Sequence, residues 1–195
     1  MTPKSGTDSV ATSERRRVLF IIPSLTGGGA ERVFSILLRH LDRSHFELHL
    51  VVLRLKGAAF AEDIPEHIVV HDLKTSRVRY ALPSIVRLVW KVKPHTILST
   101  LAHLNLALIL GKPLLPHSTR LLVREATIVS TFLSEETRHP QLWGWFYRHL
   151  YRRADKVVCL SDAMMNDLAE NFKLPREKLV RIYNPFFPLR ACAHQ

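Results

Sequence analysis

The chain has 195 residues, of which 47% are hydrophobic, so it can bury a full core and its length suits one domain better than two. Its two cysteines, Cys159 and Cys192, cannot form a disulfide framework and lack the paired spacing of a zinc site, which favours a reducing, cytoplasmic setting. The formal charge of +11 indicates a surface that attracts anions, without distinguishing nucleic acid, anionic lipid headgroups and sugar-nucleotide or lipid-linked phosphates.

Residues 1–17 are rich in serine and threonine and end in a run of arginines. They lead directly into an apolar strand, without the long hydrophobic region and small-residue cleavage site of a secretion signal. We expect this segment to be a flexible basic leader. The longest apolar stretch, residues 97–115, is interrupted by polar residues and a proline, so it falls short of a membrane span of roughly 20 residues. We therefore expect a soluble or peripheral protein.

From residue 18 onward, short β-branched runs alternate with longer helical patterns, as in βαβ units around a parallel sheet. The expected strands are residues 18–22, 48–53, 68–71, 95–99, 120–124, 156–160 and 179–182. Apolar residues at helical spacing predict the helices, which are residues 30–41, 83–93, 104–110, 141–153 and 162–171. The sequence therefore predicts an α/β domain over residues 18–183, Rossmann-like and doubly wound, with a mostly parallel sheet of about seven strands.

Two local signals mark the end of this domain. Ser161 follows a strand and precedes Asp162, which is typical of a helix N-cap with an acidic first turn. Asn184 precedes Pro185, and the residue before a proline is disfavoured in helical geometry. We expect residues 184–195 to be a truncated interdomain linker or tail, because they are too few to form a second domain.

Three glycines, Gly27, Gly28 and Gly29, stand between the first strand and the first helix, where small residues let the backbone turn tightly and approach a ligand. A nicotinamide-dinucleotide site has Gly-x-Gly-x-x-Gly or Ala and an acidic residue about 20 positions further on. Here an arginine takes the third glycine position and Arg54 follows the second strand, so only an NADP variant stays open. Glu31, in the first turn of the helix, would repel a pyrophosphate held there.

The chain resembles the opening of the family 4 glycosyltransferases, which have the GT-B fold of two Rossmann-like domains. The resemblance covers nearly all of residues 18–185, in the right order and spacing. It rests on Gly-Gly-Gly-Ala-Glu-Arg at residues 27–32, the helix pattern ending at residues 40–41, the strand at 48–53, Arg-Arg-Ala-Asp-Lys-Val-Val-Cys-Leu-Ser at 152–161 and Ile-Tyr-Asn-Pro at 182–185. It implies that an N-terminal domain binds the sugar acceptor and a C-terminal domain binds the nucleotide-sugar donor. Transfer then occurs in the cleft between them, with no tightly bound cofactor or metal.

By this resemblance, the glycine loop approaches the donor diphosphate or the acceptor, with Glu31 capping or orienting the loop. Polar residues at the carboxyl ends of strands line the ligand crevice of open α/β sheets, which adds His103 and Asn105 after the fourth strand and Arg124 and Glu125 after the fifth. Many relatives have a histidine or an Arg/Glu pair at the latter position, facing the acceptor, and this chain has the pair and lacks the histidine. Glu125, if burial raised its pKa, could take a proton from an acceptor hydroxyl, and Arg124 could bind an acidic or phosphate-bearing acceptor. An ion pair between the two, and simple helix-start packing of His103, are the structural alternatives.

The chain ends before the donor domain of these relatives would begin. We therefore expect either a truncated product or fragment, or one half of a split enzyme whose donor subunit is a separate chain. In both cases the isolated chain is expected to be inactive.

Aromatic and basic residues interleave in the helix expected at residues 141–153, a mixture suited to contact with an anionic membrane surface. They are Trp143, Trp145, Phe146, Tyr147 and Tyr151 with Arg148, Arg152 and Arg153. The same interpretation applies to a second basic group beside Trp90, which consists of Arg87, Lys91 and Lys93. The alternative is that the aromatic residues belong to the core. Contact with the inner face of the cell membrane would agree with a lipid-linked acceptor.

Stand-alone nucleic-acid binding is the rival function. The basic residues are not accompanied by a helix-turn-helix, zinc-finger or RNP-like aromatic motif, and the histidines lack metal-ligand spacing. We expect no nucleic-acid partner and no metal site.

Overall fold

The structure is a computed structural model that describes residues 15–55, 57, 64–75 and 77–185. Most of the expected leader and most of the expected tail, including Cys192, lie outside the described residues. None of the helices in the described ranges is both long and apolar enough to cross a bilayer.

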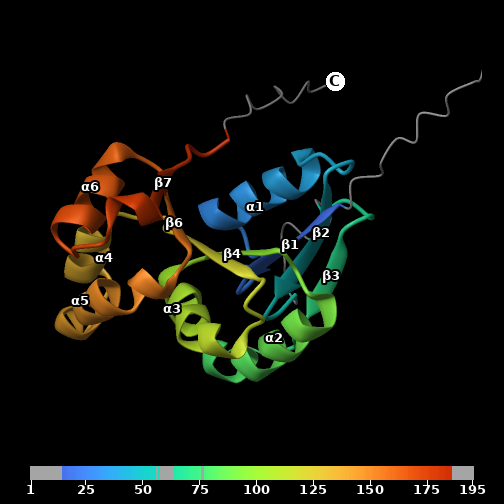
Figure 1. The fold of residues 1–195 in the computed structure, drawn as a ribbon, viewed down its shortest axis with the longest axis horizontal. Coiled ribbons are helices and arrows are strands. Elements are labelled where there is room, and N and C mark those ends of the chain that lie inside the picture. Colours follow the sequence, from blue (N-terminus) through green and yellow to red (C-terminus); the bar gives the residue numbers. More distant parts are fainter. Residues whose placement is uncertain (1–14, 56, 58–63, 76, 186–195) are drawn as a thin grey trace, which may run out of the picture.

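Seven parallel strands form one sheet in the order β3-β2-β1-β4-β5-β6-β7 (Figure 1). The order reverses direction between the adjacent strands β1 and β4, which is the switch point of a doubly wound sheet. The strands are β1 (Arg16–Ile22), β2 (Phe46–Val52), β3 (Val69–Asp72), β4 (Thr96–Thr100), β5 (Arg120–Arg124), β6 (Lys156–Cys159) and β7 (Leu179–Arg181). The prediction of a parallel sheet of seven strands is confirmed.

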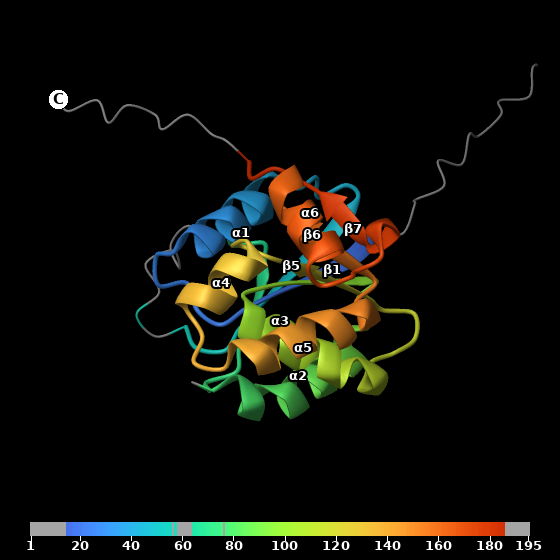
Figure 2. The ribbon, with the colours of Figure 1, turned by 90° about the vertical axis from the view of Figure 1, so that its left-hand side faces the viewer.

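Helices cover both faces of this sheet, with α1 on one side and α2 and α3 on the other (Figure 2). The helices are α1 (Gly29–His40), α2 (Val78–Val92), α3 (Ala102–Gly111), α4 (Val129–Glu135), α5 (Pro140–His149) and α6 (Asp162–Glu170). Short 3-10 turns are η1 (Lys112–Leu114), η2 (Tyr151–Arg153) and η3 (Arg176–Lys178). The predicted cap of α6 is confirmed, because Ser161 Oγ accepts a hydrogen bond of 3.2 Å from the Met164 N–H.

The helix boundaries differ from the prediction at three places. Helix α2 begins at Val78 rather than at Pro83, which lies inside the helix, and its buried residue Ala81 precedes that proline. Helix α4 was not predicted, because it is short and only Val129 is buried, which leaves no apolar periodicity to read. The helix predicted at residues 141–153 is α5 followed by the separate turn η2.

The sheet separates two apolar cores. One lies under α1 and contains Phe34 and Leu38 of that helix, and the larger one lies under α2 to α6. Successive residues of a strand point to opposite faces. In β5, Leu122 and Arg124 accordingly line a groove beside α1, whereas Val123 belongs to the larger core. This alternation also sends the two neighbours Arg124 and Glu125 to different sides of the sheet.

The groove beside α1 is apolar and has a volume of about 420 Å³. Leu98, Leu122 and Val158 form its floor, and residues 182–185 form part of its wall. Helix α1 is the single helix on this side of the sheet among the described residues, so the strands beyond it are covered less completely than those on the other face.

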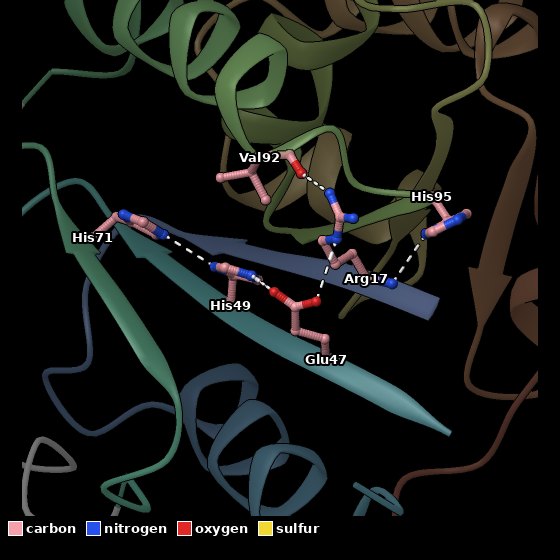
Figure 3. A network of polar contacts seen from close by, with 6 residues as sticks. All are labelled: Arg17, Glu47, His49, His71, Val92 and His95. Carbon is pink, nitrogen blue, oxygen red and sulfur yellow. Dashed lines mark hydrogen bonds and ion pairs between the residues drawn. The ribbon is translucent and has the colours of Figure 1, made fainter. Parts of the chain in front are cut away.

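A polar network runs across β1, β2 and β3 and reaches the end of α2 (Figure 3). His71 Nε2 lies 3.2 Å from His49 Nδ1, and His49 Nε2 lies 3.0 Å from Glu47 Oε1. The carboxylate of Glu47 also pairs with Arg17, whose Nη1 donates a hydrogen bond to the carbonyl oxygen of Val92 at the end of α2. Burial lowers the pKa of His71 below its ordinary value of 6.5, and the neighbouring His49 and Lys91 lower it further.

Because the pKa of His71 is lowered in the folded chain, the unfolded chain binds a proton that the folded chain does not bind as the pH falls below 6.5. The free energy of unfolding should therefore fall with pH in that range. The variant His71→Gln keeps a hydrogen-bond donor for His49, and its free energy of unfolding should depend less steeply on pH. Urea unfolding of both proteins above and below pH 6.5 measures the free energy of unfolding. The same change of this free energy with pH in both proteins would contradict the prediction.

Candidate functional site

The glycine loop lies where β1 ends and α1 begins, at the carboxyl edge of the sheet. Gly27 has a φ of +121°, which a residue with a side chain rarely adopts. Gly28 is the N-cap of α1, and a Cβ atom on it would lie 2.4 Å from Glu31 Oε2. Gly29 is the first residue of the helix and faces open space. Gly27 is therefore needed by the loop itself, whereas a side chain at Gly28 would displace the flexible end of Glu31.

Glu31 is buried against this loop, 8% exposed, at the third position of α1. A carboxylate at that position compensates the positive end of the helix dipole and reaches back toward the N-cap, as in a capping box. The structure thus places Glu31 over Gly28, close to the backbone that it was expected to cap or orient.

A second feature of the same edge is a hollow of about 270 Å³ beyond β4 and β5. Its lining comes from the turn before α3, the segment after β5 and helix α4, and consists of Leu101, Ala102, His103, Glu125, Ala126, Thr127, Phe132 and Glu136. Leu101 has a φ of +76°, a strained conformation that a leucine adopts only when its surroundings impose it. The hollow thus combines polar side chains, aromatic rings and a constrained backbone, as ligand sites do.

The side chain of His103 is exposed at this hollow, and aromatic rings hold it in place. Its ring centroid lies 4.7 Å from that of Trp143 in an edge-to-face arrangement and 6.5 Å from that of Phe132. His103 therefore packs at the start of α3 and still presents its ring to the hollow.

Glu125 is fully enclosed by hydrogen-bond donors from three helical segments, α3, α5 and η2. Its Oε1 accepts hydrogen bonds from Tyr151 Oη at 2.7 Å and from Asn105 Nδ2 at 2.9 Å, and its Oε2 accepts one from Tyr147 Oη at 3.2 Å. Asn105 also donates to the carbonyl oxygen of Arg124 and accepts a hydrogen bond from Ser99. This network joins β4, α3, β5, α5 and η2.

Burial raises the pKa of Glu125 above its ordinary value of 4.5, although the hydrogen bonds from Tyr151, Asn105 and Tyr147 and the charge of Arg124 act in the opposite direction. Burial and the Glu125 charge together raise the pKa of Tyr151, so this tyrosine remains a donor. A carboxyl group with a raised pKa meets one requirement of a general base near neutral pH. Its oxygens, however, are already engaged by protein donors.

Arg124 lies on the opposite face, beside α1. Its Nη1 donates a hydrogen bond of 3.0 Å to Thr100 Oγ1, and its Nη2 donates one of 2.8 Å to Asn184 Oδ1. Both acceptors are neutral, and no carboxylate within the described ranges forms an ion pair with this guanidinium. The ion pair between Arg124 and Glu125, given above as a structural alternative, does not form, and the two side chains make separate sets of hydrogen bonds.

The structure brings Asn105, Glu125 and the main-chain carbonyl of Arg124 into one network and places His103 and Glu125 at one hollow, while the Arg124 guanidinium lies on the other face. The glycine loop and Glu31 form a separate group on the same edge. Sequence reasoning missed Tyr147, Tyr151 and Asn184 as partners. Tyr147 and Tyr151 are four residues apart, a spacing that places both on one helix face, and this signal could have indicated a shared target.

Arg54, the residue on which an NADP site would depend, is exposed after β2. In the ranges that the structure covers, histidine, cysteine, aspartate and glutamate side chains form no group of three or more that could hold a metal ion. The thiol of Cys159 is buried, and its burial, together with the Glu125 charge, raises its pKa to about 12.

The parallel sheet, the glycine loop at its carboxyl edge and the adjoining hollow define an α/β domain of the Rossmann-like type, which matches one half of a GT-B glycosyltransferase. The sequence matches the model of Glycosyltransferase Family 4 over residues 27–186. The chain therefore belongs to glycosyltransferase family 4.

Solved structures show the same fold. Anabaena HepE, solved in complex with UDP and glucose, superposes with a TM-score of 0.66 at 16% identity, over 88% of this chain and 45% of that chain. A glycosyltransferase from Rickettsia africae gives 0.67 at 15% identity, over 88% and 43%. WaaB, a lipopolysaccharide outer core galactosyltransferase, gives 0.63 at 13% identity, over 87% and 46%. The chain thus spans less than half the length of these relatives. A search of curated proteins finds no match.

The three glycines allow a test of the loop. Gly27→Ala should lower the free energy of unfolding by about 1–3 kcal/mol, because alanine is strained at this φ. Gly29→Ala, at an open position in the first turn of α1, should be neutral or slightly stabilising. Chemical denaturation of the two variants measures both effects, and an equal loss in both would contradict the assigned geometry.

The buried carboxyl group gives a pH-dependent test. The folded chain keeps the Glu125 proton at pH values where the unfolded chain has lost it, so Glu125 lowers the free energy of unfolding as the pH rises from 4.5 through the folded pKa. The variant Glu125→Gln removes this loss of stability, because its side chain does not titrate. Its stability relative to the parent protein should therefore increase as the pH rises above 4.5. Denaturant titrations across that range check this, and a pH-independent difference would show that Glu125 does not titrate as assigned.

Proposed function

We propose that this domain is the acceptor-binding half of a family 4 glycosyltransferase, which transfers a sugar from a nucleotide-sugar to a glycan or lipid-linked acceptor. The observation that carries the proposal is the hollow beside β4 and β5, which presents His103, Thr127 and Glu136 together with Phe132 at the carboxyl edge. Polar groups that can bond hydroxyls and rings that can pack against a sugar suit an acceptor better than a bare phosphate.

The donor-binding half is proposed to lie outside this sequence, either further along a longer protein or in a partner chain. The lengths of the related structures support this proposal, because this chain covers only 43–46% of them. HepE was solved with UDP and with glucose, so a nucleotide-sugar is the co-substrate that we propose for the complete enzyme. The apolar groove beside α1 offers a surface that a second domain can cover.

The proposed roles of the individual residues follow from their contacts. His103 contacts the acceptor, because its ring is exposed at the hollow while Trp143 fixes its orientation. Arg124 contacts an anionic part of the acceptor or the donor diphosphate, since its guanidinium has only neutral partners. The glycine loop faces the donor half across the cleft.

Glu125 remains our candidate for accepting a proton from the acceptor hydroxyl, but its contacts favour a positioning role. Both of its oxygens already hold donors from α3, α5 and η2, which fixes the floor of the hollow. A positioning residue raises the KM for the acceptor when it is replaced, whereas a general base lowers kcat. Kinetics of Glu125→Gln in the complete enzyme distinguish the two roles.

Acceptor binding by the full chain tests the proposal. His103→Ala should weaken the binding of an acceptor glycan by roughly tenfold, because it removes a polar contact and an aromatic ring from the hollow. The exposed His117 lies away from the hollow, so His117→Ala serves as the matched control and should bind normally. A glycan array followed by calorimetry on the best ligand measures both. Equal loss in the two variants would refute the assignment of this hollow.

The chain by itself should not transfer sugar from a nucleotide-sugar. Transfer by the pure chain would show that it holds a donor site of its own and would contradict the incomplete-enzyme part of the proposal, while leaving the acceptor site untouched.

A further inference from the structure

Three large apolar side chains are exposed together at the edge of the sheet where the strands begin. Trp90 of α2, Leu110 of α3 and Leu114 of η1 are 54%, 49% and 59% exposed. The Trp90 indole donates a hydrogen bond of 2.9 Å to the carbonyl oxygen of Leu114, which ties the two segments together. Leu110 and Leu114 are four residues apart on continuous helical turns, so they lie on one side.

Exposed cations surround these apolar groups. Arg87 and Lys91 flank Trp90 on α2, Lys93 follows the helix, and Arg120 begins β5. We call the surface formed by Trp90, Leu110, Leu114, Lys93 and Arg120 the basal patch.

A polar hollow of about 450 Å³ adjoins the basal patch, and its lining includes Lys112, His117, Arg120 and Asp155. The Asp155 carboxylate is occupied, since it accepts hydrogen bonds of 2.7 Å from Lys112 Nζ and from the Leu121 N–H. The acid is thereby compensated, and Arg120 and His117 remain as exposed groups of the hollow. The hollow therefore suits an anionic headgroup.

The basal edge is basic beyond this patch. Arg16 begins β1, Lys156 begins β6, and Arg152 and Arg153 lie exposed in η2. Exposed apolar side chains within a field of cations are the pattern of a surface that binds an anionic membrane, where the rings and aliphatic groups enter the headgroup region and the cations meet lipid phosphates.

The surface of α5 fits this role less well. Of the five interleaved aromatic residues of α5 and η2, Tyr147 and Tyr151 are fully buried, and Trp143 and Phe146 are half-buried. Trp145 is exposed, but Glu135 at the end of the adjoining helix α4 and Glu136 directly after it bring negative charge to this side. The aromatic residues of α5 serve mainly the core and the Glu125 network.

We propose that the basal patch is the face by which this chain docks on an anionic phospholipid surface. The patch lies at the amino-terminal edge of the sheet, so docking leaves the opposite edge, with the glycine loop and the His103 hollow, free for ligands. The proposal is independent of the proposed transferase function, because it concerns a different edge of the domain.

Vesicle flotation with the full chain tests the proposal, using phosphatidylcholine vesicles with and without phosphatidylglycerol. The chain should float only with the anionic vesicles, and added salt should weaken the binding. Leu110→Ser/Leu114→Ser removes exposed apolar groups and keeps the Trp90 hydrogen bond. Its partition coefficient should fall by roughly tenfold. Leu142→Ser, at an equally exposed position of α5, is the matched control and should bind like the parent protein.

Charge reversal provides the second arm. Lys93→Glu/Arg120→Glu should reduce binding to anionic vesicles by at least roughly tenfold. Arg54→Glu/Arg77→Glu makes the same change in net charge at the opposite edge, and should reduce binding much less. Equal losses in the two pairs would show that only net charge acts, and no binding to anionic vesicles would equally overturn the proposal. Thermal unfolding of each variant confirms that it is folded.

Discussion

The buried carboxyl group of Glu125 is the contact on which the candidate site depends. Placing a carboxyl group inside a protein costs free energy unless donors surround it, and here Asn105, Tyr147 and Tyr151 supply them. The same contacts fix the end of β5 relative to α3 and α5. Because the hollow with His103 is built from the segments that these contacts join, its shape follows from the way this one acid is satisfied.

The fold could be predicted from the sequence because each strand carries its own signal. A continuous apolar run marks a strand that is covered on both faces, as in β1 and β2, and all seven expected strands are present, although the edge strand β3 is mostly exposed. Helix α4 carried no comparable signal, since it buries one residue fully. The sequence pattern starts α2 at Pro83, although residues before that proline already pack against the core.

The site could be predicted only as a set of neighbouring positions. The rule that ligands gather at the carboxyl ends of parallel strands identified His103, Asn105, Arg124 and Glu125 from sequence. The rule could not identify the residues with which these side chains form hydrogen bonds. Asn184 meets Arg124 across 60 positions, and the two tyrosines that hold Glu125 looked like surface aromatics of a basic helix. Contacts at such separations depend on the packing of helices, which local patterns do not encode.

The domain thus divides its chemistry between two edges of one sheet. The carboxyl edge holds the glycine loop, the buried acid and the hollow, whereas the amino edge collects cations and exposed apolar groups. The central claim is that the carboxyl edge belongs to the acceptor-binding half of the enzyme. The class of ligand that the pure chain binds tests this claim most directly. Separate calorimetric titrations with nucleotide-sugars and with acceptor glycans should show binding of the glycan alone, and tight nucleotide-sugar binding without glycan binding would contradict the assignment to the acceptor side.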